Sequence, residues 1–200
     1  MFKRMIMLSL AVILLGIPVQ AADWDFDKAH SNISFSVRHM VISKVKGSFT
    51  DFEGQAQFDG RSLETGSAAI TIQVLSIDTD NKDRDEHLQG PDFFDAMKYP
   101  TMTFKSKKIV PAKDGAFTMT GDLTIKGVTH EVALDGEFNG VINDPWGNTR
   151  AGFSASTKIN RQDFNMAWSN QLKDGSLIVG DDIDIHLEIE LVKARTENAE

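Results

Sequence analysis

Residues 182–191 read DIDIHLEIEL, and this stretch decides the fold class. Apolar side chains alternate strictly with polar or charged ones, which is the pattern of a β-strand with one face in a core and the other in water. The alternation places His186 on the polar face, together with Asp184 and Glu188. We therefore expect a long, half-buried strand near the end of the chain, with His186 exposed to solvent.

The same period-two alternation recurs along most of the preceding chain. Pairs that suit tight turns, such as Asp59-Gly60 and Asp114-Gly115, separate the alternating segments. The alternation breaks between Val74 and Leu75, where we expect a bulge or the end of a strand. Together these signals predict about eight strands with antiparallel neighbours. The alternating segments before the last strand are 33–38, 45–58, 70–74, 102–104, 117–125, 132–138 and 153–159.

Eight antiparallel strands can pack as a sandwich or close into a barrel. Closure removes the exposed strand edges that invite aggregation, so we expect an all-β, eight-stranded antiparallel barrel. A barrel of this size is either filled by its own side chains or holds one small ligand, as lipocalins do. The chain has 13 Phe and 1 Tyr, which favours an interior with few hydroxyl groups, although Phe is also a common core residue.

One segment, residues 81–96, departs from the alternating pattern. It reads NKDRDEHLQGPDFFDA, lacks β-branched residues and is rich in charge. Pro91 follows Gly90 and suits the first position of a helix. We therefore expect two short helical turns at one end of the barrel, the second of them beginning at Pro91.

Residues 1–21 have the features of a cleaved secretory signal peptide. Lys3 and Arg4 precede an apolar run over 5–17, and small residues stand before a cut after Ala21. The run is too short to span a bilayer, which takes about 20 apolar residues. We therefore expect one mature domain over 22–200 and a periplasmic location. No cysteine follows the cut, so we expect release rather than a lipid tether.

Composition and motifs argue against nucleic-acid binding, metal binding and catalysis. The 200-residue chain has a net charge of -8, which repels phosphate backbones and anionic lipid headgroups, and it has no Cys for a disulfide, a thiol nucleophile or a Cys-ligated metal. The nucleophile-elbow, zinc-protease, phosphate-loop and dinucleotide motifs are absent from the sequence. Asp83 and His87 have the spacing of two ligands on one helix face, but a solvated charged turn is the favoured interpretation. We expect no metal and no cofactor.

Short motifs spread over the whole mature chain occur in a fixed order. Each motif alone has little specificity, whereas the ordered set is highly specific. In this order they resemble the YceI-like family of bacterial polyisoprenoid-binding proteins. The motifs include His30-Ser31-x-Ile33-x-Phe35, Val45-x-Gly47-x-Phe49, Arg84-Asp85-x-His87-Leu88, Asp92-Phe93-Phe94-Asp95, Gly121-x-Leu123-Thr124-Ile125-x-Gly127, Asp144-Pro145-Trp146-Gly147 and Arg161-x-Asp163-Phe164.

The resemblance implies a lipocalin-like barrel with a long apolar tunnel for an isoprenoid lipid, such as a polyprenyl chain, a quinone or its precursor. It also implies a periplasmic carrier or store, and it suggests a homodimer. A polyprenyl tail offers no hydrogen bonds, so apolar side chains should line the tunnel, with Phe93 and Phe94 as a lid at the helical end. For each residue alone, ordinary core packing is the competing interpretation. The expected ligand-binding residues are Phe35, Phe49, Phe52, Ile72, Val74, Phe93, Phe94, Phe104, Phe117, Leu123, Phe138, Phe153 and Phe164.

A polar headgroup at the tunnel mouth would need charged or polar partners. The candidates are Arg84, His87 and Arg161. The alternative is a structural contact of Arg84 with Asp85 and of Arg161 with Asp163.

Three functions are compatible with these residues. The leading one is a non-enzymatic carrier of an isoprenoid lipid. The second is a packed barrel that acts as a stress-related interaction protein, and the third is a hydrolase-type enzyme that uses His30, His39 or His87 with a carboxylate. In each case we expect no nucleic-acid partner and no stable membrane insertion.

Overall fold

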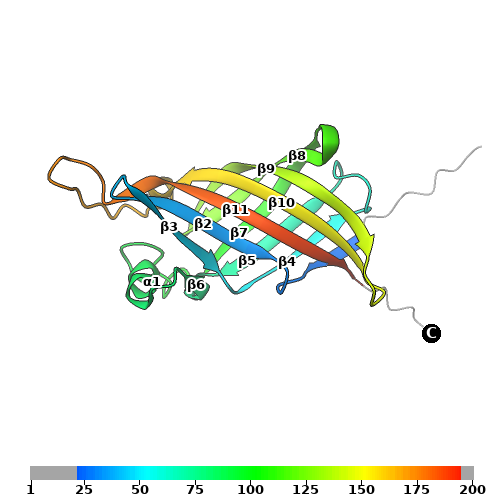
Figure 1. Cartoon of the computed structure of the whole chain (residues 1–200), viewed down its shortest axis with the longest axis horizontal. Coiled ribbons are helices and arrows are strands. Elements are labelled where there is room, and N and C mark those ends of the chain that lie inside the picture. Colours follow the sequence, from blue (N-terminus) through cyan, green and yellow to red (C-terminus); the bar gives the residue numbers. More distant parts are fainter. Residues whose placement is uncertain (1–21, 195–200) are drawn as a thin grey trace, which may run out of the picture.

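Antiparallel strands form a closed barrel in this protein (Figure 1). The structure, a computed structural model, describes residues 22–194, so the expected signal peptide lies outside the described residues. Within this range no helix is both long and apolar enough to span a bilayer. The helical elements are α1 (Lys82–Gln89) and the 3₁₀ turns η1 (Val74–Ser76), η2 (Lys113–Gly115) and η3 (Arg161–Phe164). The strands are β1 (Ala22–Phe26), β2 (Asn32–His39), β3 (Ser43–Phe49), β4 (Phe52–Phe58), β5 (Ser67–Gln73), β6 (Ile77–Asp78), β7 (Thr101–Pro111), β8 (Ala116–Ile125), β9 (Val128–Asn143), β10 (Thr149–Asn160) and β11 (Val179–Lys193).

The strands occupy eight positions around the barrel, because two short strands share a position in three places. β1 and β2 share one position, since both pair with β11, at Trp24↔Lys193 and at Ile33↔Leu187. β3 and β4 share the next, since β3 pairs with β2 and β4 with β1. β5 and β6 share the third, since β5 pairs with β4 and β6 with β3. The five strands β7 to β11 are continuous, and the arrangement confirms the eight-stranded antiparallel barrel.

Two of the interruptions lie side by side in the barrel wall. The segment 45–58, expected to be one strand, is broken between β3 and β4, and the break expected at the end of β5 is present as η1. The Thr50 amide donates to the Ser76 carbonyl (3.1 Å), and the Gln73 amide donates to the Asp51 carbonyl (2.9 Å). Backbone groups that leave the regular ladder therefore find partners in the neighbouring interruption.

The inner faces of the strands form two apolar clusters. One contains Phe49 and lies near α1. The other is built around Trp24, which is 1% exposed, donates its indole N–H to the Phe58 carbonyl (3.1 Å) and stacks on the Phe58 ring at 4.7 Å. Phe138 and Phe153 pack against Phe58 with ring centroids 6.0 and 5.7 Å away. We call Trp24, Phe58, Phe138 and Phe153 the aromatic plug.

The helix α1 lies at one end of the barrel, where short helical turns are expected (Figure 1). The Asn81 side chain caps its first turn by accepting a backbone hydrogen bond. The prediction of a second helical turn from Pro91 is wrong. Residues 91–94 form non-helical turns, which the Phe94 amide ties to α1 by donating to the Leu88 carbonyl (3.0 Å).

Three glycines of the wall make room for phenylalanine rings from adjacent strands. A Cβ atom placed on Gly136 would lie 2.4 Å from the Phe117 ring, closer than real Cβ contacts come. A glycine inside a strand often marks such a close approach. The other two pairs are Gly47 with Phe35, at 2.6 Å, and Gly121 with Phe104, at 2.5 Å.

We expect Gly136→Ala to lower the free energy of unfolding by about 1–3 kcal/mol, because the added methyl group forces the Phe117 ring out of place. Gly152→Ala on β10 is the matched control, since the nearest atom to its Cβ would lie 3.5 Å away. There the substitution should be neutral or stabilising by up to about 1 kcal/mol, because alanine restricts the unfolded chain. Urea denaturation of both variants measures the difference, and equal effects would contradict this account of the glycines.

Candidate functional site

The barrel encloses a cavity of about 250 Å³. The alternating apolar residues of β11 face it from Ile183 to Leu191, whereas His186 is exposed as predicted. These eight residue steps, at about 3.3 Å each, span roughly 26 Å of the wall. The cavity is therefore long and runs beside the strand whose pattern decides the fold.

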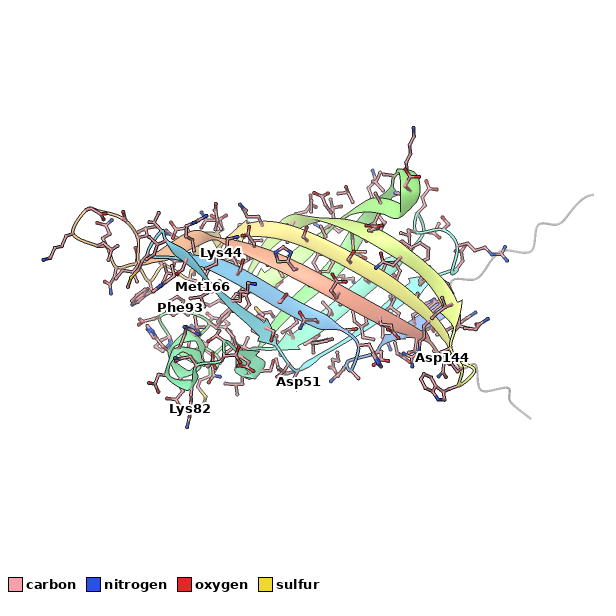
Figure 2. The ribbon with its side chains drawn as sticks, in the orientation of Figure 1. Lys44, Asp51, Lys82, Phe93, Asp144 and Met166 are labelled. Atoms are coloured by element: carbon pink, nitrogen blue, oxygen red, sulfur yellow. The ribbon has the colours of Figure 1, made fainter. Side chains whose placement is uncertain are left out.

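Polar groups are rare on the cavity wall. Most of the lining side chains are Ile, Leu, Val, Phe and Met, contributed by nearly every strand. Phe93 and Met166 line the end near α1, and both lie there in Figure 2. A ligand in this cavity would meet apolar surface along most of its length. The polar residues that line it are Ser34, Gln57, Ser67, Thr157 and Arg161.

Nine of the thirteen expected ligand-binding residues line this cavity. Phe93 and Phe94 lie at the end near α1, which is the place expected for a lid. The other seven come from six strands of the wall. They are Phe35, Phe49, Ile72, Phe104, Phe117, Leu123 and Phe153.

Four of the expected residues lie away from the cavity: Phe52, Val74, Phe138 and Phe164. Val74 is 1% exposed and packs in the solid core, because β5 ends at Gln73 and the strand face assigned to Val74 does not continue into η1. Phe52 begins β4 after the interruption and packs in the same cluster. Phe138 belongs to the aromatic plug.

Phe164 is displaced from the cavity by the turn η3, which follows the end of β10. It is 2% exposed and packs edge-on against His130, with ring centroids 5.1 Å apart. Met166, from the loop after η3, takes the cavity-lining place instead. Strand alternation carries no information on such loop residues, so the cavity-lining place of Met166 could not be predicted from it.

Arg84 and His87 do not line the cavity. The Arg84 Nε donates to Thr79 Oγ1 (2.7 Å), and the same hydroxyl donates to Asp85 (2.6 Å), so the expected contact of Arg84 with Asp85 passes through Thr79. His87 Nε2 lies 3.0 Å from an Asp92 carboxylate oxygen. Arg84 and His87, which were expected to contact a headgroup, instead make hydrogen bonds that hold α1 and the adjacent turns in place.

Arg161 lies on the cavity wall and is 2% exposed. Its guanidinium donates to the Gly180 carbonyl (3.0 Å), to the Met166 carbonyl and to the Asp181 carboxylate (2.7 Å). The prediction that Arg161 contacts Asp163 is wrong, because its carboxylate partner is Asp181. Burial lowers the pKa of Arg161, and the charge of Asp181 partly offsets this effect. The side chain joins η3, the following loop and β11 at the end of the cavity near α1.

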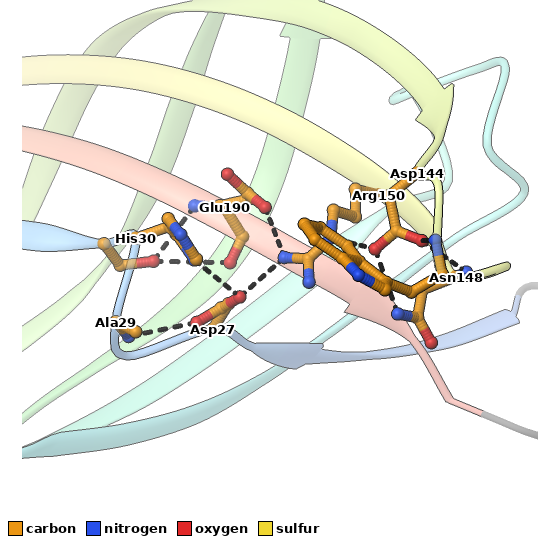
Figure 3. A network of polar contacts seen from close by, with 9 residues as sticks. Asp27, Ala29, His30, Asp144, Asn148, Arg150 and Glu190 are labelled. Carbon is orange, nitrogen blue, oxygen red and sulfur yellow. Dashed lines mark hydrogen bonds and ion pairs between the residues drawn. The ribbon is translucent and has the colours of Figure 1, made fainter.

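A second polar cluster lies on the outside of the barrel (Figure 3). Arg150 stands between three carboxylates, 2.7 Å from Asp144, 2.6 Å from Asp27 and 2.5 Å from Glu190. Burial opposes the ionisation of Asp27, but hydrogen bonds from Arg150 and His30 outweigh it and lower its pKa to about 2. The pKa of Asp144 is lowered and that of Arg150 is raised by the same contacts.

Two histidines of the hydrolase alternative, His30 and His87, have carboxylates and not hydroxyl groups as hydrogen-bond partners. His30 Nδ1 lies 2.9 Å from Asp27, but the neighbouring Ser31 hydroxyl donates to the Glu190 carbonyl (3.3 Å). Asp27, His30 and Glu190 lie close enough for a metal ion, yet the Arg150 guanidinium already supplies the positive charge between the two carboxylates. The arrangement is that of a structural ion-pair network.

Comparisons with known proteins agree with this geometry. A sequence model of the YceI-like domain matches residues 24–191. A UPF0312 protein of Vibrio parahaemolyticus is 38% identical over 169 residues, which cover 83% of this chain and 89% of that protein.

Solved structures share the barrel as well. BcnA of Burkholderia cenocepacia is 33% identical and superposes with a TM-score of 0.71, over 83% of this chain and 99% of that chain. A polyisoprenoid binding domain from Saccharophagus degradans, implicated in plant cell wall breakdown, has a TM-score of 0.66 over 86% of this chain and 98% of that chain. At 13% identity the latter shows a common fold. From the matched domain and the relatives above 30% identity, the chain belongs to the YceI-like family.

Proposed function

We propose that this protein is a periplasmic carrier or store for an isoprenoid lipid and not an enzyme. The observation that carries the proposal is the long cavity with its almost wholly apolar wall. Burial of each methylene group contributes about 0.8 kcal/mol, so a prenyl chain gains ample free energy there without hydrogen bonds. Membership of the YceI-like family, and a fold shared with a domain named for polyisoprenoid binding, support this ligand class. The signal-peptide features of residues 1–21 support the location.

The polar end of the ligand is best placed near Arg161. It is the one charged side chain on the cavity wall within residues 22–194. The carbonyl groups around it already hold the guanidinium, so a headgroup would share this charge rather than displace it. The packed-barrel alternative is disfavoured, because a barrel filled by its own side chains would leave no cavity of this size.

Organic extraction of protein purified from its own host tests the proposal. Mass spectrometry should find a prenyl lipid close to stoichiometric with the protein. An extract without such a lipid would contradict the carrier function, whatever the state of the fold.

A pair of phenylalanine substitutions separates ligand space from packed core. Ala155 lines the cavity on β10, whereas Val74 is buried in the core. We expect Ala155→Phe to keep the unfolding free energy of the lipid-free protein while its lipid content falls. Val74→Phe should instead cost about 1–3 kcal/mol, because overpacking strains a filled core. Thermal melting and lipid content are measured for both. A full lipid load in Ala155→Phe would show that the ligand does not use this space.

A further inference from the structure

The turn between β2 and β3 exposes three consecutive apolar side chains. Met40, Val41 and Ile42 are 37%, 54% and 87% exposed. We call residues 40–42 the hairpin tip. Neither the core nor the turn needs apolar residues there, because a tight hairpin turn of this kind favours Asn and Gly.

The backbone conformation of the hairpin tip also disfavours apolar residues with large side chains. Met40 and Val41 have φ angles of 47° and 65°, in the left-handed region. A β-branched residue such as valine rarely adopts it, and such strain tends to be kept where a function requires it. The surroundings hold the conformation, since the Met40 amide donates to the Ile178 carbonyl (2.8 Å) and Arg38 donates to the Val41 carbonyl (3.0 Å).

Positive charge flanks the hairpin tip. Residues 38–46 read RHMVISKVK, with three cations and no carboxylate, although the whole chain has a net charge of -8. Arg38, Lys44 and Lys46 are all exposed. Lys44 shares the Asp184 carboxylate at 2.7 Å, so its charge is partly compensated. The apolar tip could enter the acyl-chain layer of an anionic bilayer while Arg38, Lys44 and Lys46 contact the phosphates at its surface.

The hairpin tip also lies beside the end of the cavity near α1. Val37 and Val179 line the cavity, and Val179 pairs with His39, the residue before the tip. Figure 2 shows Lys44 at the same end of the barrel as Phe93 and Met166. A bilayer that receives the tip would therefore face the end of the cavity where Arg161 lies.

We propose that the hairpin tip inserts into the surface of an anionic lipid bilayer and brings this end of the cavity to it. The inference rests on the proposed function, because a lipid carrier has to reach a bilayer to load or release its ligand. The contact is peripheral, with three side chains among the acyl chains and the barrel in water.

Flotation of the full-length mature protein with vesicles tests this role. Vesicles of phosphatidylcholine with phosphatidylglycerol should bind the wild type, and salt or vesicles of phosphatidylcholine alone should weaken binding. Ile42→Asn should lower the partition coefficient by roughly tenfold, since it removes the most exposed apolar side chain of the tip. Ile142→Asn is the matched control, because Ile142 is 65% exposed on β9 and lies away from the hairpin.

A double variant shows that loss of binding is not loss of fold. Met40→Asn with Val41→Gly supplies the residues that the turn prefers, so Tm should hold or rise while vesicle binding falls. The inference is overturned if the wild type does not bind anionic vesicles, if the tip variants bind as well as the wild type, or if Ile142→Asn loses as much. A tip variant that changes only the oligomeric state would also overturn it, in favour of contact with a second copy. The lipid content of the natively purified protein is measured separately. A wild type that binds vesicles but contains no prenyl lipid after purification from its own host would contradict the carrier function and not the role of the tip.

Discussion

Arg161→Met is expected to lower the free energy of unfolding by about 3–5 kcal/mol. The substitution keeps roughly the volume of the side chain but removes the guanidinium that donates to the Gly180 and Met166 carbonyls. It also leaves the Asp181 carboxylate without its cation. Buried acceptors without partners are costly, so the loop between η3 and β11 should detach as the variant is destabilised. Urea denaturation measures the stability, and hydrogen exchange of residues 166–180 measures the loop.

Two further variants check that the guanidinium geometry is responsible. Arg161→Lys should recover little stability, because one ammonium group cannot reach acceptors on three segments at once. Asp181→Asn should cost much less than Arg161→Met, since the amide oxygen still accepts a hydrogen bond and Asp181 is partly exposed. If Arg161→Lys were as stable as the wild type, charge alone and not the fork of donors would explain the site.

Arg150→Met is expected to reverse the acid response of the protein. In the wild type the pKa of Asp27 is lowered from 3.8 to about 2, so the folded state binds fewer protons than the unfolded state. Its stabilising contribution is complete above the unfolded pKa and is lost as pH falls through about 2. Without Arg150, the carboxylates of Asp27 and Asp144 lose the hydrogen bonds that lower their pKa values and are left beside the Glu190 carboxylate without a cation, so both pKa values rise in the folded state. The variant should therefore be destabilised at neutral pH and should gain stability as the pH falls toward the new pKa values.

Thermal melting of both proteins at neutral and mildly acidic pH measures this reversal. The difference in Tm between wild type and Arg150→Met should shrink as the pH falls. Lys107→Met is the control, because Lys107 also bridges two carboxylates, Asp122 and Glu131, but is 47% exposed. Its removal should change Tm little at any pH. A constant Tm difference for Arg150→Met across the pH range would show that lost packing, and not charge, explains its effect.

The alternation of apolar residues was sufficient to predict the barrel and most of the cavity wall. Along a continuous strand such as β11, the side chains that face inward follow from the period of two, and the five apolar residues from Ile183 to Leu191 all line the cavity. The same reasoning failed for Val74 and Phe164, which lie just beyond the end of a strand. A 3₁₀ turn changes the direction of the side chains within it and after it. The break in the alternation after Val74 indicated the end of β5 but not the direction of the Val74 side chain.

The partners of the charged residues could not be predicted from spacing. Arg161 bonds Asp181, 20 residues away, and Arg150 bonds Asp27, 123 residues away. Such contacts depend on barrel closure and on the course of the loop after η3, and neither can be predicted from the sequence near Arg150 or Arg161. Asp163 and Asp85 were expected as partners because they lie close to Arg161 and Arg84 in the sequence. In the folded protein, Asp181 and Thr79 are the residues that these arginines contact.

The aromatic plug would limit the length of a chain-like ligand that fits inside the cavity. Trp24 and Phe58 are 1% and 2% exposed and stack on each other in the apolar cluster away from α1, and Phe58 lines the cavity, so in the proposed carrier a chain that enters near α1 would end against these rings. If the ligand is the isoprenoid lipid that we propose, each isoprene unit inside the cavity would add affinity through buried apolar surface, whereas each unit that stays outside would add nothing. Affinity should thus climb with chain length and then level off. The distance from Arg161 to Phe58, rather than any hydrogen bond, would set the length at which it does so.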